Sequence, residues 1–466
     1  MEKRIKLAYI GGGSKAWARV FMNDLALTEG LGGTIALYDI DRPAAERNQR
    51  IGQRMNDLPQ AKARWEYVVC DTLAEALAGC DFVAISILPG TFDEMAFDVH
   101  APEKYGIYQS VGDTVGPGGV LRAMRSVPLY EGFARAIEKY CPEAWVITLT
   151  NPMTILTKTL YDVFPGIKAF GCCHEVFHAE EFLTCVLTEE LGIRRPHRLE
   201  LTVDASGINH FTWITRARYQ DTDALDLLPS FMDKYFEEGY CEQLGHGPRD
   251  HLGEDPFLYG NRVKMDLFRR FGVLAAAGDR HLVEFLPRAQ YLSGPEGATR
   301  WKFHLTTVDY RKADQRRKME ETIAMAEGRK PITLERSDEE LVNFIKAILG
   351  MGPVVSNANL VNVGQMPQLP RGSVVETNCL FDRDTVKPIT ASLLPEPVIS
   401  LVLPNARNIE NTYAAIKNRD LNGIFEAFLA QPLCYGLSYE DGRTLFKEMV
   451  QGTREYVEPW FDLSNL

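Results

Sequence analysis

The fold of this chain is set near its start by Ile5-Lys-Leu-Ala-Tyr-Ile-Gly-Gly-Gly-Ser14, a mostly apolar run that ends in three glycines and a serine. Its composition predicts a buried strand, and the glycines predict a tight turn. A helical stretch, Ala16–Leu27, and a second strand, Thr34–Tyr38, follow, and Asp39 stands at the end of the second strand. Strand, glycine turn, helix, strand and acid in this order are typical of the start of a dinucleotide-binding unit.

The residues of this unit have predicted contacts with a dinucleotide. At Gly11 and Gly13 the backbone can approach a pyrophosphate, which the helix start beyond Ser14 then stabilises with free amides. Asp39 is placed to accept hydrogen bonds from an adenosine ribose diol, and its charge would repel a 2′-phosphate, so NAD is favoured over NADP. A glycine cluster alone is often only a tight turn, and Ala16 stands here in place of the third glycine of the usual fingerprint. The surrounding strands and helix favour the dinucleotide.

Alternating strands and helices continue beyond this unit and predict an α/β fold, a Rossmann-type doubly wound parallel sheet. Strand Trp145–Thr150 leads to Asn151, which can pair with a hydroxyl or a nicotinamide amide, or can act as a turn residue. The polar, glycine-rich segment Tyr108–Gly119 is expected to be a long functional loop before the helix Leu121–Tyr140. The other elements expected in this half are the strands Tyr67–Cys70 and Phe82–Ile87 and the helix Leu73–Ala78.

The periodicity changes past His210. We therefore expect two domains: a NAD-binding Rossmann domain over residues 1–195, and a mixed α+β domain over residues 196–466 for substrate, metal and oligomer contacts. The active cleft is expected between them. The first helices expected in the second domain are Asp223–Glu238 and Pro256–Phe271.

Composition narrows the class of protein. The 466 residues carry a net charge of −12, which argues against a nucleic-acid partner or an anionic membrane. Nine cysteines without paired spacing indicate a reducing compartment and not a disulfide framework. No apolar run is long enough to span a membrane, and no cleavable signal sequence is visible at Met1–Arg4. We expect a cytoplasmic protein.

Two short clusters place metal-ligand side chains after strand-like runs. Gly171-Cys-Cys-His-Glu-Val176 follows Ile167–Phe170, and Ser206-Gly-Ile-Asn-His-Phe211 follows Leu199–Val203. A thiolate from the first cluster and a neutral imidazole from the second could share one divalent metal. A buried free cysteine and a hydrogen-bonded core histidine explain the same residues equally well.

Five motifs, in order and spacing, carry a family resemblance. They are the glycine turn, Gly112-Asp-Thr114 with Gly116, Gly118 and Gly119, Thr150-Asn-Pro152, Gly171-x-Cys173-His174 and Gly207-x-Asn209-His210. Together they resemble the family 4 glycosidases, which are NAD- and manganese-dependent hydrolases with a malate-dehydrogenase-like domain. The resemblance runs from about Lys6 to about Pro388 and is dense as far as Glu284.

This resemblance implies redox-assisted elimination in place of displacement between two carboxylates. NAD would take a hydride from C3 of the sugar, and the resulting ketone would acidify the proton at C2. A base would remove that proton while a metal polarises the oxygens at C2 and C3. The aglycone would leave from C1, water would add, and the hydride would return, so that no net oxidation occurs.

The resemblance also implies roles for single residues. Cys173 and His210 match the metal ligands, and His174 is the candidate general acid. The base that removes the C2 proton is expected to be Asp279, with Tyr259 as the second candidate. Substrate contacts are implied for Asp113, Arg122 and Asn151, and Glu175 is expected in the same pocket.

The Cys-His-Glu-Val form of residues 173–176 resembles the α-galacturonidase branch. We therefore expect hydrolysis of an α-galacturonide by a homodimer or homotetramer. The alternatives are an α-glucosidase, α-galactosidase or α-glucuronidase of the same family, a NAD-dependent 2-hydroxyacid dehydrogenase, and a silent NAD-binding sensor. The identity of the metal also stays undecided, because a thiolate–imidazole pair favours zinc whereas the resemblance implies Mn²⁺.

Other ionisable residues carry weaker signals. His178 is expected to be a helix-start or core residue, and His246 and His251 are expected in a surface loop. A uronate needs local positive charge in so acidic a protein. The candidates for that charge are Arg122, Arg280 and Arg288, with His281 and His304 as further possible partners of a carboxylate.

Overall fold

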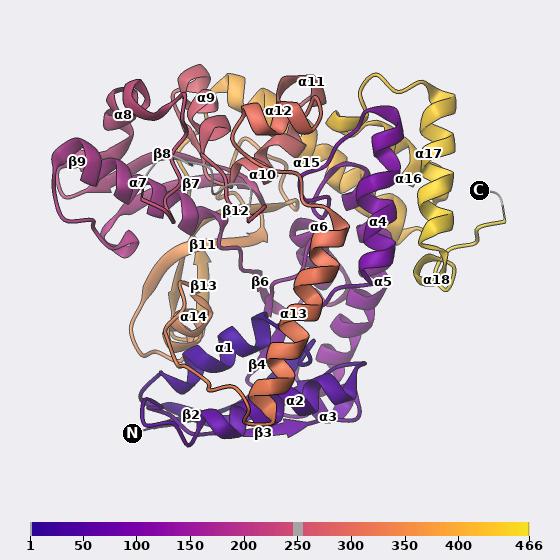
Figure 1. Ribbon diagram of the computed structural model, residues 1–466. Helices are drawn as coiled ribbons and strands as arrows, with labels where there is room; N and C mark the ends of the chain where they lie inside the picture. Colours follow the sequence, from indigo (N-terminus) through magenta and orange to yellow (C-terminus); the bar gives the residue numbers. More distant parts are fainter. Residues whose placement is uncertain (1, 246–254, 465) are drawn as a thin grey trace.

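A single large sheet organises the molecule (Figure 1). The computed structural model describes residues 2–245, 255–464 and 466. Within them thirteen strands join one sheet, in the order β10-β8-β7-β12-β11-β6-β5-β4-β1-β2-β3, with β13 paired to β12 and β9 paired to β8. His246 and His251 lie outside the described residues.

The N-terminal half of the sheet is parallel. Its strands run in the order β3-β2-β1-β4-β5-β6, and every neighbouring pair is parallel. This order is that of a doubly wound dinucleotide-binding sheet, so the fold class predicted from the sequence is confirmed. The strands are β1 (Lys3–Ile10), β2 (Leu31–Tyr38), β3 (Trp65–Val69), β4 (Phe82–Ile85), β5 (Trp145–Thr148) and β6 (Lys168–Gly171).

Helices cover both faces of this half, because alternate residues of a strand point to opposite sides. In β1, Leu7 and Tyr9 enter one buried cluster, whereas Ala8 and Ile10 enter another. The helices are α1 (Trp17–Ala26), α2 (Arg42–Met55), α3 (Leu73–Leu77), α4 (Phe92–His100), α5 (Gly116–Tyr140), α6 (Met153–Val163) and α7 (Glu175–Leu191).

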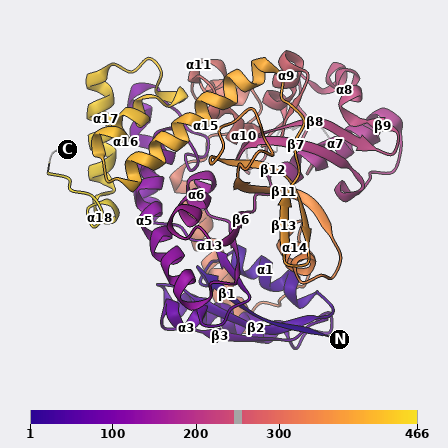
Figure 2. The same cartoon turned by 180° about the vertical axis from the view of Figure 1, so that it is seen from behind.

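The rest of the sheet is antiparallel and continues from the first half. β11 pairs with β6 through Asn359 and Gly171, and β12, β7, β8 and β10 follow outward. Figure 2 shows β11 and β12 between the N-terminal sheet and the region of β7 and β8. The domain boundary at residues 195/196 stays a prediction. The strands are β7 (Thr202–Ile208), β8 (Phe211–Tyr219), β9 (Thr222–Asp223), β10 (Leu274–Ala275), β11 (Val354–Val361), β12 (Val374–Asp382) and β13 (Thr385–Pro388).

The helices of the second half pack around this extension and back onto the first half. Helix α13 returns to contact α2 and α4 (Figure 1), and the amide of Val308 at its start lies 3.3 Å from Nε2 of His100. None of the described helices is long and apolar enough to cross a membrane. The remaining helices are α8 (Leu228–Tyr235), α9 (Arg262–Phe271), α10 (Asp279–Leu282), α11 (Arg288–Tyr291), α12 (Pro295–Arg300), α13 (Val308–Ala326), α14 (Leu341–Ile348), α15 (Glu396–Lys417), α16 (Leu421–Leu429), α17 (Tyr439–Gly452) and α18 (Arg454–Val457).

Several elements differ from the sequence prediction; the expected helix Asp223–Glu238, for example, is α-helical only over Leu228–Tyr235. Helix α5 begins at Gly116 and not at Leu121, so the end of the expected long loop is helical. A Cβ at Gly118 would lie 2.6 Å from the carbonyl oxygen of Gly112, so these glycines permit tight helix packing. Strand β7 extends to Ile208, and α9 begins only at Arg262, after Asn261 in a left-handed conformation (φ 53°).

Candidate active site

The glycine turn joins β1 to α1 and is closed against β2 and β4. The amides of Gly11 and Gly12 both donate to the carbonyl oxygen of Tyr38, at 2.9 Å. Gly11 has φ +94°, and a Cβ there would lie 1.9 Å from the carbonyl oxygen of Ser86, so no other residue fits. The turn lies at the carboxyl end of a central parallel strand, where a dinucleotide pyrophosphate binds in this type of sheet.

Asp39 and Asn48 hold this turn in place. Oδ2 of Asp39 accepts from the amide of Gly13 at 2.8 Å. Nδ2 of buried Asn48 donates to the carbonyl oxygens of Gly12 (2.7 Å) and Ser14 (2.9 Å). Each carboxylate oxygen has two lone pairs, so Asp39 can still accept from a ribose hydroxyl. The glycine turn and Asp39 are therefore compatible with a bound dinucleotide. Sequence reasoning missed Asn48, because an amide in an amphipathic helix gives no local signal of its partner.

Glu284 fixes the loop that carries Asp113. Its Oε1 accepts from the amides of Val111 (2.7 Å) and Gly112 (3.0 Å), across more than 170 residues of sequence. Burial raises the pKa of Glu284 to about 7. Glu284 thus positions the predicted substrate-contacting residue without being predicted itself, since only the folded chain brings the two segments together.

Asp113 lies at the centre of a polar cluster. Its Oδ1 accepts from Oγ1 of Thr114 at 2.7 Å, and its Oδ2 accepts from Nδ2 of Asn151 at 3.2 Å. Burial raises the pKa of Asp113, but the charges of Arg122, His281 and His210 outweigh this and hold it well below its usual range. Oδ1 of Asn151 and Nε of Arg122 are buried and have no hydrogen-bond partner among the described residues.

His210 stands between β7 and β8 in the left-handed conformation (φ 63°). Its Nδ1 lies 2.8 Å from Oγ1 of Thr114, whose only proton is donated to Asp113. Nδ1 of His210 must therefore donate, which leaves the lone pair of Nε2 free. Burial and the neighbouring His281 lower the pKa of His210 to about 3, so the ring is neutral near pH 7 and suited to bind a metal.

One candidate metal group forms around His210. Ligand atoms of Asp113, His210 and His281 all lie within 4.8 Å of one another, and the two imidazole rings are 3.8 Å apart between centroids. A second group of this kind consists of His174, Glu175 and His178. Cys173 belongs to neither group. Its pKa is raised well above the usual value by burial and by Glu376 and Glu175. The role of Cys173 as a ligand stays a prediction.

His174 and Glu175 begin helix α7 beside the glycine turn. The ring of His174 stacks on Trp17 of α1 at 5.5 Å, and its Nδ1 lies 3.3 Å from Oε1 of Glu339. Burial lowers the pKa of His174, but the hydrogen bond to Glu339 and its charge outweigh this and raise it. Glu175 accepts from the amide of Gly278 at 2.6 Å, and its Oε1 lies 3.7 Å from Nε2 of both His174 and His281.

The two candidate bases differ in their contacts. Both oxygens of buried Asp279 accept from the first amides of α9, Oδ2 from Val263 (3.1 Å) and Oδ1 from Lys264 (3.0 Å). Burial raises the pKa of Asp279 to about 7. The hydroxyl of Tyr259 is buried, lies over Gly278 and has no hydrogen-bond partner among the described residues.

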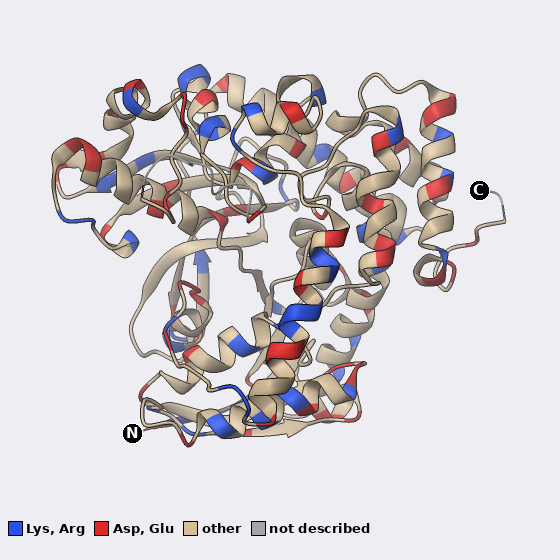
Figure 3. Cartoon of the chain, in the orientation of Figure 1, with Lys and Arg blue, Asp and Glu red and all other residues tan. Residues whose placement is uncertain are grey.

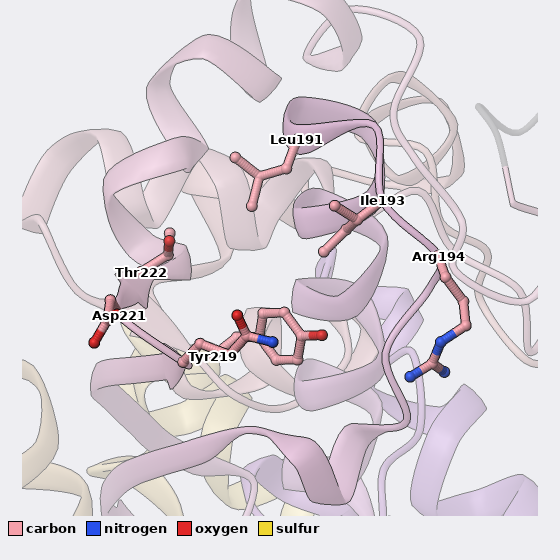
Figure 4. A pocket seen from close by; sticks show the side chains of 7 residues that line it. Leu191, Ile193, Arg194, Tyr219, Asp221 and Thr222 are labelled. Atoms are coloured by element: carbon pink, nitrogen blue, oxygen red, sulfur yellow. The ribbon is translucent and has the colours of Figure 1, made fainter.

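Arg280 and Arg288, the other arginines considered for the substrate, already donate to backbone carbonyl oxygens. Arg280 donates to the carbonyl oxygen of Ser110 at 2.8 Å, and Arg288 to that of Tyr105 at 2.9 Å. Figure 4 shows a separate pocket of about 240 Å³. Its lining residues, none of which is a predicted site residue, are Leu191, Ile193, Arg194, Tyr219, Gln220, Asp221 and Thr222.

Known proteins are similar to this chain in sequence and in fold. An α-galacturonidase of Thermoanaerobacterium saccharolyticum is 49% identical over 456 residues, which cover 98% of this chain and 97% of that protein. The crystal structure of lplD from Bacillus subtilis, which carries a provisional assignment as a glucosidase, is 46% identical, with a TM-score of 0.88 over 96% of this chain and 99% of that chain. A 6-phospho-α-glucosidase from gut microorganisms, in complex with NAD and Mn²⁺, shares the fold at 19% identity, with a TM-score of 0.78 over 99% of this chain and 100% of that chain.

Family models match most of the sequence. Residues 6–189 match the family 4 glycosyl hydrolase model, and residues 205–434 match the model of the C-terminal domain of the same family. The family expected from the five motifs is therefore confirmed. The chain belongs to the family 4 glycosyl hydrolases.

Proposed function

We propose that this protein is an α-galacturonidase that uses NAD and a divalent metal, with Mn²⁺ as the expected ion. The observation that carries the proposal is the cluster of Asp113, His210 and His281. Asn151, which follows the carboxyl end of parallel strand β5, donates a hydrogen bond to Asp113 of this cluster. The same chain has a glycine turn at the end of β1 and is 49% identical to an α-galacturonidase. When bound, NAD would supply a hydride acceptor and donor for C3, and the metal would polarise the oxygens at C2 and C3.

The residues that would hold NAD are those of the first βαβ unit. Gly11 and Gly13 would let the backbone approach the pyrophosphate, and the N-terminal end of α1, which follows Ser14, would stabilise its charge. Asp39 would accept from the ribose hydroxyls and disfavour a 2′-phosphate. Asn151 has a buried Oδ1 that no described residue bonds, which suits a nicotinamide amide or a sugar hydroxyl.

The metal would be bound by His210, with Cys173 as its partner as the family motifs imply. The free lone pair at Nε2 of His210 supports this role. Asp113 and His281 are close enough to His210 to add an oxygen and a second nitrogen. An oxygen ligand makes Mn²⁺ more favourable than a thiolate–imidazole pair alone would, because manganese prefers oxygen donors.

His174 would act as the general acid for the leaving group. Glu339 raises its pKa against the effect of burial, which favours the protonated ring that an acid needs. Glu175 would orient His174 and line the sugar pocket, and Arg122 would contact the substrate beside Asp113.

Tyr259 is the better of the two candidates for the base at C2. Its hydroxyl is unpartnered, and the ring lies against Gly278, whose amide is bonded to Glu175. Asp279 uses both carboxylate oxygens to cap α9, which supports a positioning role for Asp279. The structure thus favours Tyr259 over Asp279 as the base, whereas the sequence favoured Asp279.

We also propose a cytoplasmic homodimer or homotetramer that has neither a nucleic acid nor a membrane as partner. All nine cysteines are free thiols, which supports a reducing compartment. The net charge of −12 supports the exclusion of polyanionic partners.

The function can be tested with the purified protein and nitrophenyl glycosides. Hydrolysis of the α-galacturonide is expected only with NAD, Mn²⁺ and reductant present, and without accumulation of NADH. A preference for the neutral α-galactoside would contradict the proposed substrate. Stoichiometric NADH formation from a 2-hydroxyacid would favour the dehydrogenase alternative.

A further inference from the structure

Two arginines near Asp113 leave buried donors unused. Arg122 lies in α5 and Arg311 in the first turn of α13, and Nε of each is buried without a hydrogen-bond partner in residues 2–245 and 255–464. Neither guanidinium makes an ion pair within the described parts of the chain. Buried donors without partners are costly, and guanidinium groups are the side chains best shaped for a bidentate bond to a carboxylate.

Hydrogen bonds connect the segment just before α13 to the loop that carries Asp113. The amide of Thr306 donates to the carbonyl oxygen of Ser110 at 3.4 Å, and Arg280 bonds both Ser110 and Thr306. Arg280 and Arg311 both lie over the ring of Phe257, at 5.1 and 4.7 Å from its centroid. Arg311 is therefore held next to the polar cluster although 198 positions, 311 minus 113, separate it from Asp113 in the sequence.

Electrostatics supports the same placement. Burial lowers the pKa of Arg311, while Asp113 raises it and Arg122 lowers it, so both of these charges act on this guanidinium. Asp113 is one carboxylate among these arginines and already accepts from Thr114 and Asn151. Neither Arg122 nor Arg311 has an ion-pair partner among the described residues, so an anionic substrate group could pair with both.

The other arginines of the region are already bonded. Arg280 donates to Ser110 and Thr306, Arg288 to the carbonyl oxygen of Tyr105, and Arg125 to Asp98 at 3.0 Å. Arg311 also gains nothing from its helix, because a cation in the first turn opposes the helix dipole. Figure 3 shows Lys and Arg interspersed with Asp and Glu along α13, so the helix as a whole is not a basic surface.

We propose that Arg311, together with Arg122, binds the C6 carboxylate of the galacturonide and determines the preference for a uronic acid over the neutral sugar. The inference rests on the proposed function and adds a residue to it. It replaces Arg280 and Arg288, which the sequence suggested for this role, with a residue from a helix that gave no signal of its own.

The test compares Arg311→Gln with Arg317→Gln. Arg317 lies on the same helix, but it is exposed and, among the described residues, pairs with Asp314 and Glu321 of that helix. Arg311→Gln should lower kcat/KM for nitrophenyl α-galacturonide by about 10- to 100-fold, the usual effect of losing a charged hydrogen bond, and leave the galactoside within about twofold. Binding of free galacturonate, measured by calorimetry with NAD and Mn²⁺ present, should weaken by a similar factor. Arg317→Gln should behave as wild type in both assays.

The outcomes separate this inference from the proposed function. An unchanged preference of Arg311→Gln for the galacturonide, or an equal loss on both sugars together with unchanged galacturonate affinity, would overturn the role of Arg311. If wild type fails to cleave the galacturonide but binds galacturonate through Arg311, the proposed function fails and the carboxylate site stands. Arg311→Lys gives an internal check, because a lysine keeps the charge and loses the bidentate geometry; it should lie between wild type and Arg311→Gln.

Discussion

Replacing Asn48 with leucine should weaken NAD binding without touching the cofactor. Nδ2 of Asn48 donates to the carbonyl oxygens of Gly12 and Ser14, which fixes the turn against α2. Leucine has a similar size and no donor, so both carbonyl oxygens lose their partner. A buried hydrogen bond contributes about 0.5–1.5 kcal/mol, so two give about 1–3 kcal/mol. If that energy holds the turn in its binding form, the Kd for NAD should rise roughly 5- to 150-fold.

The neighbouring residue provides the matched control. Gln49 is the next residue of α2 and donates from Nε2 to the carbonyl oxygen of Tyr67 in β3, away from the glycine turn. Gln49→Leu also removes an amide donor, in this case a half-buried one, and should leave the Kd for NAD within about twofold of wild type. Both variants are titrated with NAD by calorimetry in the absence of sugar and metal, after circular dichroism has shown that they are folded. Equal affinities of Asn48→Leu and wild type would refute the assignment of the turn as the NAD site or of Asn48 as its support.

Three further predictions concern the chemistry. Cys173→Ser should abolish galacturonide hydrolysis at saturating NAD, because a serine hydroxyl stays protonated and is a poorer ligand; full activity without added metal would exclude a ligand role. Glu339→Gln should remove the interaction that raises the pKa of His174, so the alkaline limb of the kcat profile should move to lower pH; an unchanged limb would show that His174 is not the acid. Tyr259→Phe should reduce kcat by about 10²–10⁴-fold, while Asp279→Asn should mainly lower the thermal midpoint; the reverse pattern would restore Asp279 as the base.

The parallel half of the fold was readable from the sequence because its signals are local. The apolar run before Gly11 and the acid at Asp39 lie within one βαβ unit, and both appear where expected. The insertion of β11 beside β6 could not be predicted, because the contact of Gly171 with Asn359 joins segments 188 positions apart, 359 minus 171, and neither segment carries a pairing signal.

The candidate site also combines residues with local sequence signals and residues whose roles depend on long-range contacts. The motifs supplied Asp113, Asn151 and His210, and the structure brings them together with His281, which the sequence offered only as a partner for a carboxylate. The residues that orient or complete the cluster, such as Glu284 and Arg311, act across long sequence separations. Their roles depend on which backbone amides and carboxylates the fold places beside them, and composition does not encode this.

The most direct test of the proposed mechanism is the isotopic composition of the product formed in D₂O. Elimination requires the C2 proton to leave before water adds at C1, and a base such as Tyr259 exchanges its proton with solvent before returning it. The galacturonate released in D₂O should therefore carry deuterium at C2, detected by mass spectrometry and located by NMR. Galacturonate that forms at the wild-type rate with only hydrogen at C2 would contradict elimination and would indicate direct displacement at C1.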